Sequence, residues 1–557
     1  MAGGAVGVGR RGGRPQRASG TVHVIGASAL GTVFEWYDFF LYGSLASYIA
    51  VHFFSSVDET TGFILALATF AVGFVVRPVG ALFFGRIGDL VGRKNTFLAT
   101  LALMGLATFL VGLLPGYATL GLAAPLLLVG LRLLQGLAIG GEFGGAYIYV
   151  AEHAPEGRRG LYTGWISATA VSGMLLSLIV ILSTRLALSA EEFSAWGWRV
   201  PFLVSVILLG ISLWIRMRLN ESPVFRQMKA EQRLSHSPLS EAFLEWRNCR
   251  FVAIAIFGAV MGQAVTFYTS TFYAMFFLER VARVEPMTVT VLVACALLIA
   301  APFVLVTGWL SDRIGRKPVL LAGLGLAALL YIPLFGALLD AANPSLANAR
   351  VDAPVIVRAA PAECSLQFDP VGRKSFHATS CDVVKSLLAR AGINHSTEPL
   401  AAAVPAQLEI GETVLAAPDA ATLAGRGRAA AVDAFQARAQ AALEAAGYRA
   451  GAELSRAEAV RVVAILLALL AIASFCGGAY GILLVELFPA RFRYSAVSVA
   501  QNVGNGWFGG LLPAIAFTIV AATGNVFAGL WYPVLVSAAC FLIALVALPE
   551  TRGRSID

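Results

Sequence analysis

Charged residues are scarce in this sequence. Asp, Glu, Lys and Arg make up 13% of the 557 residues and 58% are hydrophobic, whereas a soluble domain carries about 25% charged residues. With a mean hydropathy of +0.76, the composition excludes a soluble globular protein and predicts an integral membrane protein. The net charge of +8 arises from Lys and Arg gathered in short stretches between apolar runs. Because that pattern orients a membrane protein, we expect no nucleic-acid partner.

Motifs of catalysis and nucleotide binding are also missing. The chain has no Walker loop, and no constellation of nucleophilic, metal-binding or nucleotide-binding residues stands out. Residues 7–12 match G-x-G-x-x-G, but no strand precedes them, so we reject a dinucleotide site. The sequence therefore predicts neither an enzyme nor a pump driven by ATP hydrolysis, and we expect no cofactor and no metal.

Apolar segments long enough to span a membrane, which takes about 20 residues, recur along the chain. The first is not a cleaved signal peptide, because its apolar run is too long and contains Glu35 and Asp38. Lys and Arg concentrate in the N-terminal tail and on alternate loops, which predicts cytoplasmic termini for a multi-pass protein of the cell (inner) membrane. The twelve predicted spans are 21–53, 60–84, 95–115, 121–151, 160–183, 199–216, 251–278, 287–310, 318–339, 460–485, 495–522 and 526–548.

A charged ten-residue loop between two apolar runs occurs twice. Residues 85–94 read GRIGDLVGRK, and residues 308–317, 223 positions later, read GWLSDRIGRK. A repeat at this distance predicts a duplicated bundle of membrane helices. Its aspartate can pair with a basic residue or cap a neighbouring helix in one conformation and release it in another, so we interpret the loop as a gate. The shared residues are Gly85, Asp89, Gly92, Arg93 and Lys94 in the first copy and Gly308, Asp312, Gly315, Arg316 and Lys317 in the second.

A second repeated loop locates an insertion. Residues 152–159 (EHAPEGRR) correspond to residues 486–493 (ELFPARFR), but their offset is 334 residues, so 111 residues were inserted after the ninth span. The predicted organisation is a cytoplasmic tail at 1–20, a six-helix half at 21–216, a cytoplasmic linker at 217–250, spans 7 to 9 at 251–339, an inserted outer-face domain at 340–459, spans 10 to 12 at 460–548 and a cytoplasmic tail at 549–557.

The inserted domain has its own signals. Residues 429–447 predict a helix, whereas residues 341–361 are interrupted by proline and predict a loop. Cys364 and Cys381 are the only pair of the six cysteines in an exposed, oxidising position, so we expect a disulfide between them. A metal site that adds His377 or His395 is the alternative, although the spacing fits no standard pattern.

Five ionisable side chains lie within the predicted spans of the first half. Burying a charge in a bilayer costs about 2.5 to 3.5 kcal/mol, so each needs a reason. Helical spacing places Tyr42 on the face of the first two carboxylates, and Gln135 on the face of the last two charges. One face of each helix can therefore point into a shared cavity. The five residues are Glu35, Asp38, Arg77, Arg132 and Glu142.

The charge count in that cavity suggests proton coupling. Three carboxylates face two guanidinium groups, and a carboxylate left without a partner in a low dielectric tends to hold a proton. We interpret Glu35, Asp38 and Glu142 as candidates for carrying the proton, and Arg77 and Arg132 as candidates for neutralising a substrate carboxylate. The alternative is a static ion network that joins the helices.

The second half has essentially no ionisable residue within its spans. It offers Gln263, Tyr268, Asn502 and Asn505, which could bind a solute or could simply pack. Span 121–151 carries glycine at every fourth position, at 136, 140 and 144. This pattern either lets a neighbouring helix approach closely or provides a hinge.

These loops resemble the signature of the major facilitator superfamily. Residues 34–39 (FEWYDF), Arg77-Pro78, residues 132–136 (RLLQG) with 141–145 (GEFGG), and residues 220–225 (NESPVF) resemble its metabolite:proton symporter branch, which includes permeases for α-ketoglutarate, shikimate, citrate, and proline or betaine. The resemblance covers residues 21–339 and 460–553. It implies two six-helix halves, alternating access and proton-coupled uptake, with the five ionisable residues carrying coupling and substrate binding.

The sequence thus predicts an all-α membrane protein of twelve helices in two pseudo-symmetric halves, with an extra outer-face domain. We expect it to import a small organic acid or zwitterion with protons, to contact membrane lipid and to be a monomer. One alternative is a sugar or polyol porter, because residues 221–223 (ESP) and 549–553 (PETRG) also resemble sugar porters. Another is a sensor built on a transporter scaffold, with the inserted domain as its receptor.

Overall fold

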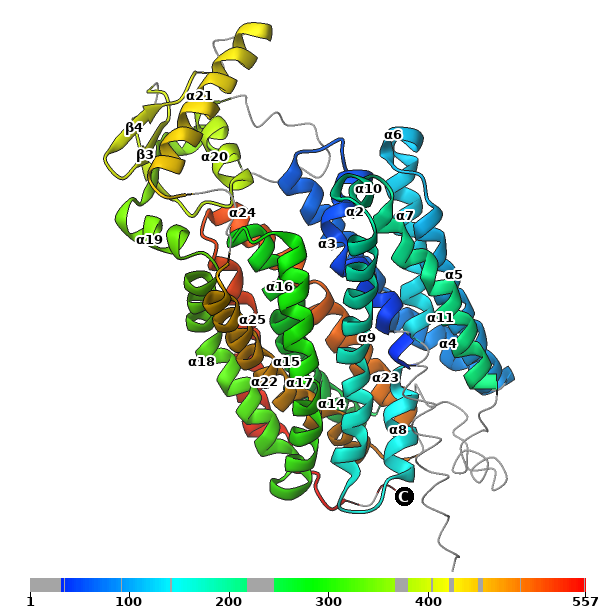
Figure 1. Ribbon diagram of the computed structural model, residues 1–557. Coiled ribbons are helices and arrows are strands. Elements are labelled where there is room, and N and C mark those ends of the chain that lie inside the picture. The colour runs from blue at the N-terminus through cyan, green and yellow to red at the C-terminus, as the bar shows by residue number, and fades with distance from the viewer. Residues whose placement is uncertain are drawn as a thin grey trace, which may run out of the picture.

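The fold was obtained as a computed structural model, in which a bundle of long helices carries a smaller body at one end (Figure 1). We call this the insert end, and the opposite end, where the C-terminus lies, the C-terminal end. The structure describes residues 32–34, 36–91, 93–140, 143–217, 245–365, 379–401, 404–419, 425–448, 454–490, 492–554 and 556.

The helices of the two halves follow one another with short connections. The first half contains α2 (Ala46–Phe53), α3 (Glu59–Val75), α4 (Arg77–Val91), α5 (Arg93–Leu113), α6 (Tyr117–Leu120), α7 (Ala123–Gly140), α8 (Phe143–His153), α9 (Arg159–Ala187), α10 (Ala190–Ala195), η1 (Gly197–Arg199) and α11 (Val200–Met217). The second half contains α14 (Trp246–Ala255), η2 (Ile256–Val260), α15 (Met261–Tyr268), η3 (Thr269–Tyr273), α16 (Ala274–Phe276), η4 (Phe277–Val281), α17 (Pro286–Ile314), α18 (Arg316–Ala342), α22 (Arg456–Leu487), α23 (Arg493–Val503), η6 (Gly504–Gly510), α24 (Leu512–Thr523), η7 (Ala528–Leu530) and α25 (Trp531–Ala547).

The predicted twelve-helix bundle agrees with these elements. Within the described residues, 10 helical stretches are long and apolar enough to cross a membrane, and each overlaps a predicted span. The predicted span 95–115 corresponds to the shorter apolar helix Leu98–Leu113. The predicted span 21–53 is helical from residue 36, apart from one turn residue.

The segment between α18 and α22 folds into an α/β body, which we call the inserted domain. Its strands form one sheet in the order β2-β1-β3-β4, in which β1 runs parallel to β2 and antiparallel to β3. Both α20 and α21 pack against this sheet. The elements are α19 (Pro344–Asp352), β1 (Val355–Ala359), η5 (Pro361–Glu363), α20 (Ser380–Arg390), β2 (Ser396–Pro399), β3 (Gln407–Ile410), β4 (Thr413–Ala416) and α21 (Gly425–Ala445).

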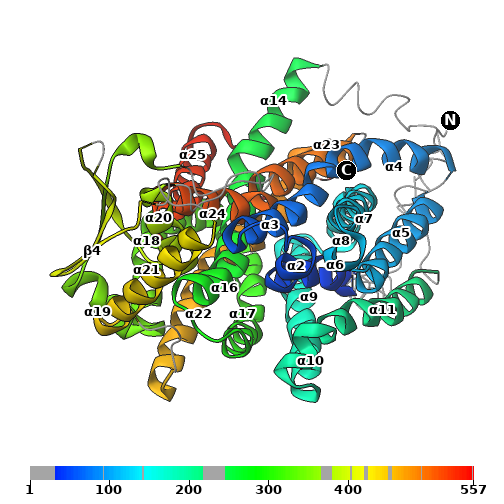
Figure 2. The ribbon, with the colours of Figure 1, turned by 90° about the horizontal axis from the view of Figure 1, so that it is seen from above.

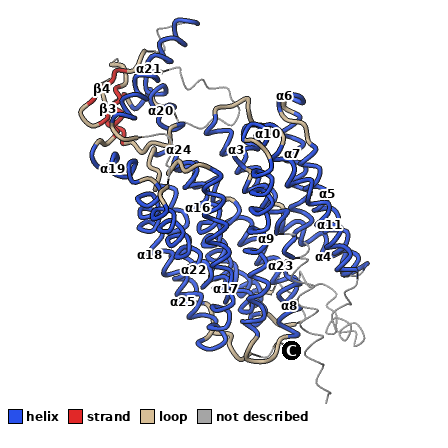
Figure 3. Tube along the Cα trace, in the orientation of Figure 1, coloured by secondary structure: helices blue, strands red, loops and turns tan. Residues whose placement is uncertain are grey.

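The all-α prediction therefore holds for the membrane bundle but not for the inserted domain, where Figure 3 shows the strands. The predicted helix at 429–447 is confirmed by α21. The predicted loop at 341–361 is wrong, because α19 and β1 lie there. Pro344 and Pro361 were interpreted as breaks, but each lies in the first turn of a helix. A missing N–H removes no helical hydrogen bond at that position.

Glycines bring α7 into close contact with α3 and α4. A Cβ on Gly140 would overlap the carbonyl oxygen of Arg77, and a Cβ on Gly136 would overlap that of Gly73. Of the two interpretations of these glycines, the described contacts support close helix approach. This contact matters for the site, because α7 carries Arg132 and α4 begins at Arg77.

Replacing Gly140 with alanine should destabilise the protein. The added methyl group has no space against the Arg77 carbonyl, and such overpacking costs about 1 to 3 kcal/mol. We expect a lower melting temperature for the purified Gly140→Ala variant in detergent. Gly130→Ala on the same helix is the matched control, because nothing lies within 4 Å of its added methyl group. Equal melting temperatures for the two variants would contradict the packing argument.

Candidate functional site

Arg77 lies where one membrane span is interrupted. Pro78 has no N–H to donate to the carbonyl of Phe74, and the helix turns at Val76 between α3 and α4. The guanidinium carbon of Arg77 lies 4.5 Å from the ring centroid of Phe39 and 4.0 Å from that of Phe74. Its side chain is 2% exposed. Cation–π contacts of this kind contribute about 2 kcal/mol when they are desolvated.

Arg132 on α7 is held in a similar way. Its guanidinium carbon lies 3.6 Å from the ring centroid of Tyr42, and its Nη1 donates to Gln135 Oε1 at 2.6 Å. Gln135 Nε2 in turn donates to the Thr108 hydroxyl on α5 at 2.7 Å. Gln135 therefore positions Arg132, and Tyr42 offers it an aromatic face.

Both arginines keep the same pair of donors without partners. In Arg77 and in Arg132, the buried Nε and Nη2 atoms have no hydrogen-bond partner among the described residues. These two atoms form one edge of a guanidinium group, and that edge matches the two oxygens of a carboxylate. The two groups lie close enough for their charges to repel each other. An anion between them would relieve that repulsion.

Asp38 joins this cluster through Thr108. The carboxyl is buried, its side chain interacts with the Thr108 hydroxyl, and its Oδ1 has no hydrogen-bond partner. No ion pair joins Asp38 to Arg77 or Arg132 in the part of the chain that is described. Thr108 was missed from the sequence, because a single threonine in an apolar span carries no distinguishing signal.

The second half contributes aromatic residues to the same level of the bundle. Tyr268 lies near the Arg77 charge, and its ring is 5.4 Å from that of Phe74. Gln263 is buried on α15, and its Oε1 has no partner. By contrast, Asn502 donates to the carbonyl oxygens of Gly140 and Ser498 at 3.1 and 2.8 Å. Asn505 donates to the carbonyl oxygen of Gln501 at 3.3 Å. These two amides bond to the backbone in this conformation.

Some predicted residues cannot be placed. Glu35, Glu142 and Gly92 lie outside the described residues. Gly85 and Asp89 fall in α4, and Arg93 and Lys94 fall in α5, but the structure does not describe these side chains.

The second copy of the repeated loop joins the two halves at the C-terminal end. Asp312 accepts from Gly160 N at 2.8 Å and from Leu161 N at 2.9 Å, so it caps the first turn of α9. Gly308 allows this approach, because a Cβ there would lie 2.6 Å from the Gly160 carbonyl oxygen. Gly315 has a φ of 109°, which favours glycine.

The basic residues of this copy hold the aspartate in place. Arg316 pairs with Asp312 at 2.7 Å and with Glu486 at 3.2 Å, and all three side chains are at most 4% exposed. Lys317 donates to the carbonyl oxygen of Leu545 at 2.9 Å. A second bridge between the halves, Arg493 to Glu152 at 3.3 Å, lies in the other repeated loop.

The halves also meet at the insert end. Arg280 on η4 pairs with Glu59 on α3 at 2.6 Å, with side chains 29% and 60% exposed. The ring of Phe63 contacts those of Phe276 and Phe517, with centroids 5.5 and 5.4 Å apart. The described contacts therefore close the bundle at both ends.

Comparisons with known proteins agree with this architecture. The model of the Major Facilitator Superfamily matches residues 28–356, and that of Sugar (and other) transporter matches residues 436–557. The chain is 38% identical over 331 residues to the inner membrane metabolite transport protein YhjE of Escherichia coli K12, covering 58% of this chain and 74% of that protein. It is 34% identical over 321 residues to the alpha-ketoglutarate permease of the same strain, covering 58% and 72%.

A further relative and a solved structure extend the comparison. The chain is 37% identical over 322 residues to the proline/betaine transporter of Salmonella typhimurium, covering 56% of this chain and 63% of that protein. The proton:xylose symporter XylE bound to 6-bromo-6-deoxy-D-glucose aligns with a TM-score of 0.62 at 15% identity, over 97% of this chain and 98% of that chain. This likeness concerns the fold alone. The relatives are transporters and not enzymes.

Removing the Asp312 carboxylate should expose the start of α9. The first amides of a helix have no acceptor within the helix, and here Asp312 accepts from two of them. For Asp312→Ala we expect hydrogen exchange of a peptide covering residues 158–165 to become at least several-fold faster. Asp352→Ala, at an exposed aspartate of the inserted domain, is the control. Unchanged exchange in Asp312→Ala would show that the cap does not hold this end closed.

Proposed function

The chain belongs to the Major Facilitator Superfamily, and we propose that it imports a small organic acid or zwitterionic metabolite together with protons. The observation that carries this proposal is the pair of buried guanidinium edges on Arg77 and Arg132 that have no partner. A sugar would leave two desolvated cations uncompensated, whereas a carboxylate satisfies both charge and donors.

The contacts suggest how a proton and the solute are coupled. Asp38 interacts with Thr108, which accepts from Gln135, and Gln135 holds Arg132. A protonated carboxyl donates a hydrogen bond where an ionised one only accepts. Proton transfer at Asp38 would therefore change the hydrogen bonding of Thr108 and, through Gln135, the position of Arg132. The roles proposed for Glu35 and Glu142 rest on the sequence.

Alternating access would then require the two ends to open in turn. We propose that the C-terminal end faces the cytoplasm and the inserted domain faces outward, in a bacterial inner membrane. Release of solute to the cytoplasm would break the bonds from Asp312 to Gly160 and Leu161, and entry of solute would separate Arg280 from Glu59.

Proton symport predicts a pH signal. When solute is added to cells that express the protein, we expect the external pH to rise with a pool of carboxylic acids or betaines. Asp38→Asn should abolish the rise, because the amide cannot carry the proton, while Asp352→Asn should leave it unchanged. The readout is an external pH electrode, with pools of dicarboxylates, aromatic acids, betaines and sugars. Alkalinisation that persists in Asp38→Asn would refute the role of Asp38.

The arginines separate this proposal from a sugar or polyol porter, which the match of residues 436–557 to the sugar transporter model keeps open. For a carboxylate solute, Arg132→Lys keeps the charge but loses the two-donor edge, and Arg77→Gln loses the charge. Because charge-assisted hydrogen bonds contribute about 1.5 to 3 kcal/mol, we expect kcat/KM for labelled solute to fall tenfold or more in either variant. Full uptake of an uncharged solute by Arg77→Gln would favour the sugar porter.

A further inference from the structure

The inserted domain is fixed to the second half of the bundle. His395 N donates to the carbonyl oxygen of Gly524 at 3.1 Å, and Asn394 Oδ1 accepts from Val526 N at 3.2 Å. Asn343 Nδ2 donates to the carbonyl oxygen of Ala282 at 3.0 Å. Figure 2 shows this domain, with α20 and α21, beside α18 and α24 of the second half.

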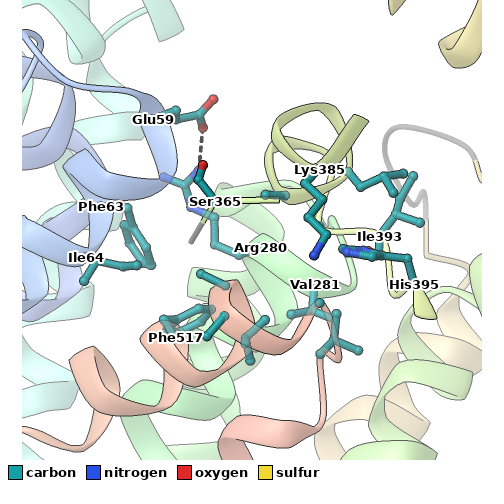
Figure 4. A pocket seen from close by; sticks show the side chains of 18 residues that line it. Glu59, Phe63, Ile64, Arg280, Val281, Ser365, Lys385, Ile393, His395 and Phe517 are labelled. Carbon is teal, nitrogen blue, oxygen red and sulfur yellow. Dashed lines mark hydrogen bonds and ion pairs between the residues drawn. The ribbon is translucent and has the colours of Figure 1, made fainter. Parts of the chain in front are cut away.

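A pocket of about 100 Å³ lies where the inserted domain meets both halves (Figure 4). Since a water molecule needs about 10 to 15 Å³ of such space, the pocket has room for a small organic molecule. The inserted domain contributes Lys385 and His395, α3 contributes Glu59 and Phe63, and the second half contributes Arg280 and Phe517.

The charges in this pocket favour an anion. The only carboxylate among its lining residues, Glu59, is paired with Arg280. Asp382, which lies near Lys385, accepts from both the N–H and the hydroxyl of Ser365 at 2.8 and 2.7 Å. Lys385 has no ion-pair partner in the part of the chain that is described, and Figure 4 shows its amino group beside the His395 ring.

The environment of the two basic groups agrees with this. Burial lowers the pKa of Lys385. Burial lowers the pKa of His395 as well, and the neighbouring Lys385 charge adds a smaller effect in the same direction. A negative group between them would counteract both effects. The ring fits there because position 524 is a glycine with a φ of 70°, where a Cβ would lie 2.4 Å from His395 Cε1.

The remaining walls are apolar. Phe63 and Ile64 of α3, Leu388 of α20, and Phe517 and Val520 of α24 line the pocket. A carbon chain would be desolvated favourably against these side chains, whereas inorganic phosphate has nothing to offer them.

We propose that this pocket is a binding site for a small carboxylate, separate from the transport site between Arg77 and Arg132. The carboxylate group lies between Lys385 and His395, and the carbon chain lies against Phe63 and Phe517. Because the walls come from the inserted domain and both halves, the bound molecule touches every part that must move for the insert end to open.

The test is calorimetric titration of the purified full-length protein in detergent with butyrate, butyramide and inorganic phosphate. We expect butyrate to bind, and the neutral butyramide and inorganic phosphate to bind at least tenfold more weakly. Lys385→Met, which keeps the aliphatic stem, should weaken butyrate binding at least tenfold, and Lys385→Arg should restore much of it. His395→Gln should weaken it as well. Equal binding of butyrate and butyramide, or of butyrate and phosphate, would overturn the proposal.

Two control variants make the assignment specific. Arg438→Ala removes an exposed cation from α21 of the same domain and should leave butyrate binding unchanged. Arg132→Gln alters the proposed transport site and should also leave it unchanged. If Arg132→Gln abolishes the signal while Lys385→Met does not, the heat belongs to the transport site and the pocket assignment fails. Melting temperatures of all variants show whether each one is folded.

Discussion

A guanidinium group buried within a membrane bundle must be held by neighbours, and the choice of neighbours decides what it can still bind. Here aromatic faces do most of the holding: Phe39 and Phe74 for Arg77, and Tyr42 for Arg132. Rings accept the positive charge without using the N–H donors. If carboxylates held these arginines instead, both the charge and the donors would already be satisfied. The glycine contact between α7 and α4 brings the two groups into one site, so the packing of small residues and the chemistry of the arginines depend on each other.

The two ends of the bundle are closed by bonds of different strength. At the insert end the ion pair between Arg280 and Glu59 is partly exposed, and such pairs contribute about 0 to 1 kcal/mol. At the C-terminal end Asp312 and its partners are buried, and breaking a buried pair costs several kcal/mol. The bundle described here should therefore open more readily at the insert end. The inserted domain lies at that end, on the second half and against α3, where a bound molecule could shift the balance.

Much of the site followed from local composition. A charge within an apolar run is visible without any structure, which is why Asp38, Arg77 and Arg132 could be identified directly. Thr108 could not be identified, because its importance comes only from lying between Asp38 and Gln135. The inserted sheet was missed for a related reason: its strands have only four or five residues each, and their pairing joins segments up to about fifty residues apart. Cys364 and Cys381 form a disulfide in the structure, as their isolation in one exposed segment suggested.

The sequence by itself determined that the chain is a membrane bundle of two related halves, that it carries charges in the first half, and that a domain is inserted after the ninth span. Those features depend on hydropathy, repeats and spacing, which are properties of neighbouring residues. Only the tertiary structure decided which edges of the arginines are free, that Asp312 caps α9 of the other half, and that Lys385 and His395 share a pocket with α3. Each of these depends on distances between helices far apart in the chain, and those distances are set by how the helices pack.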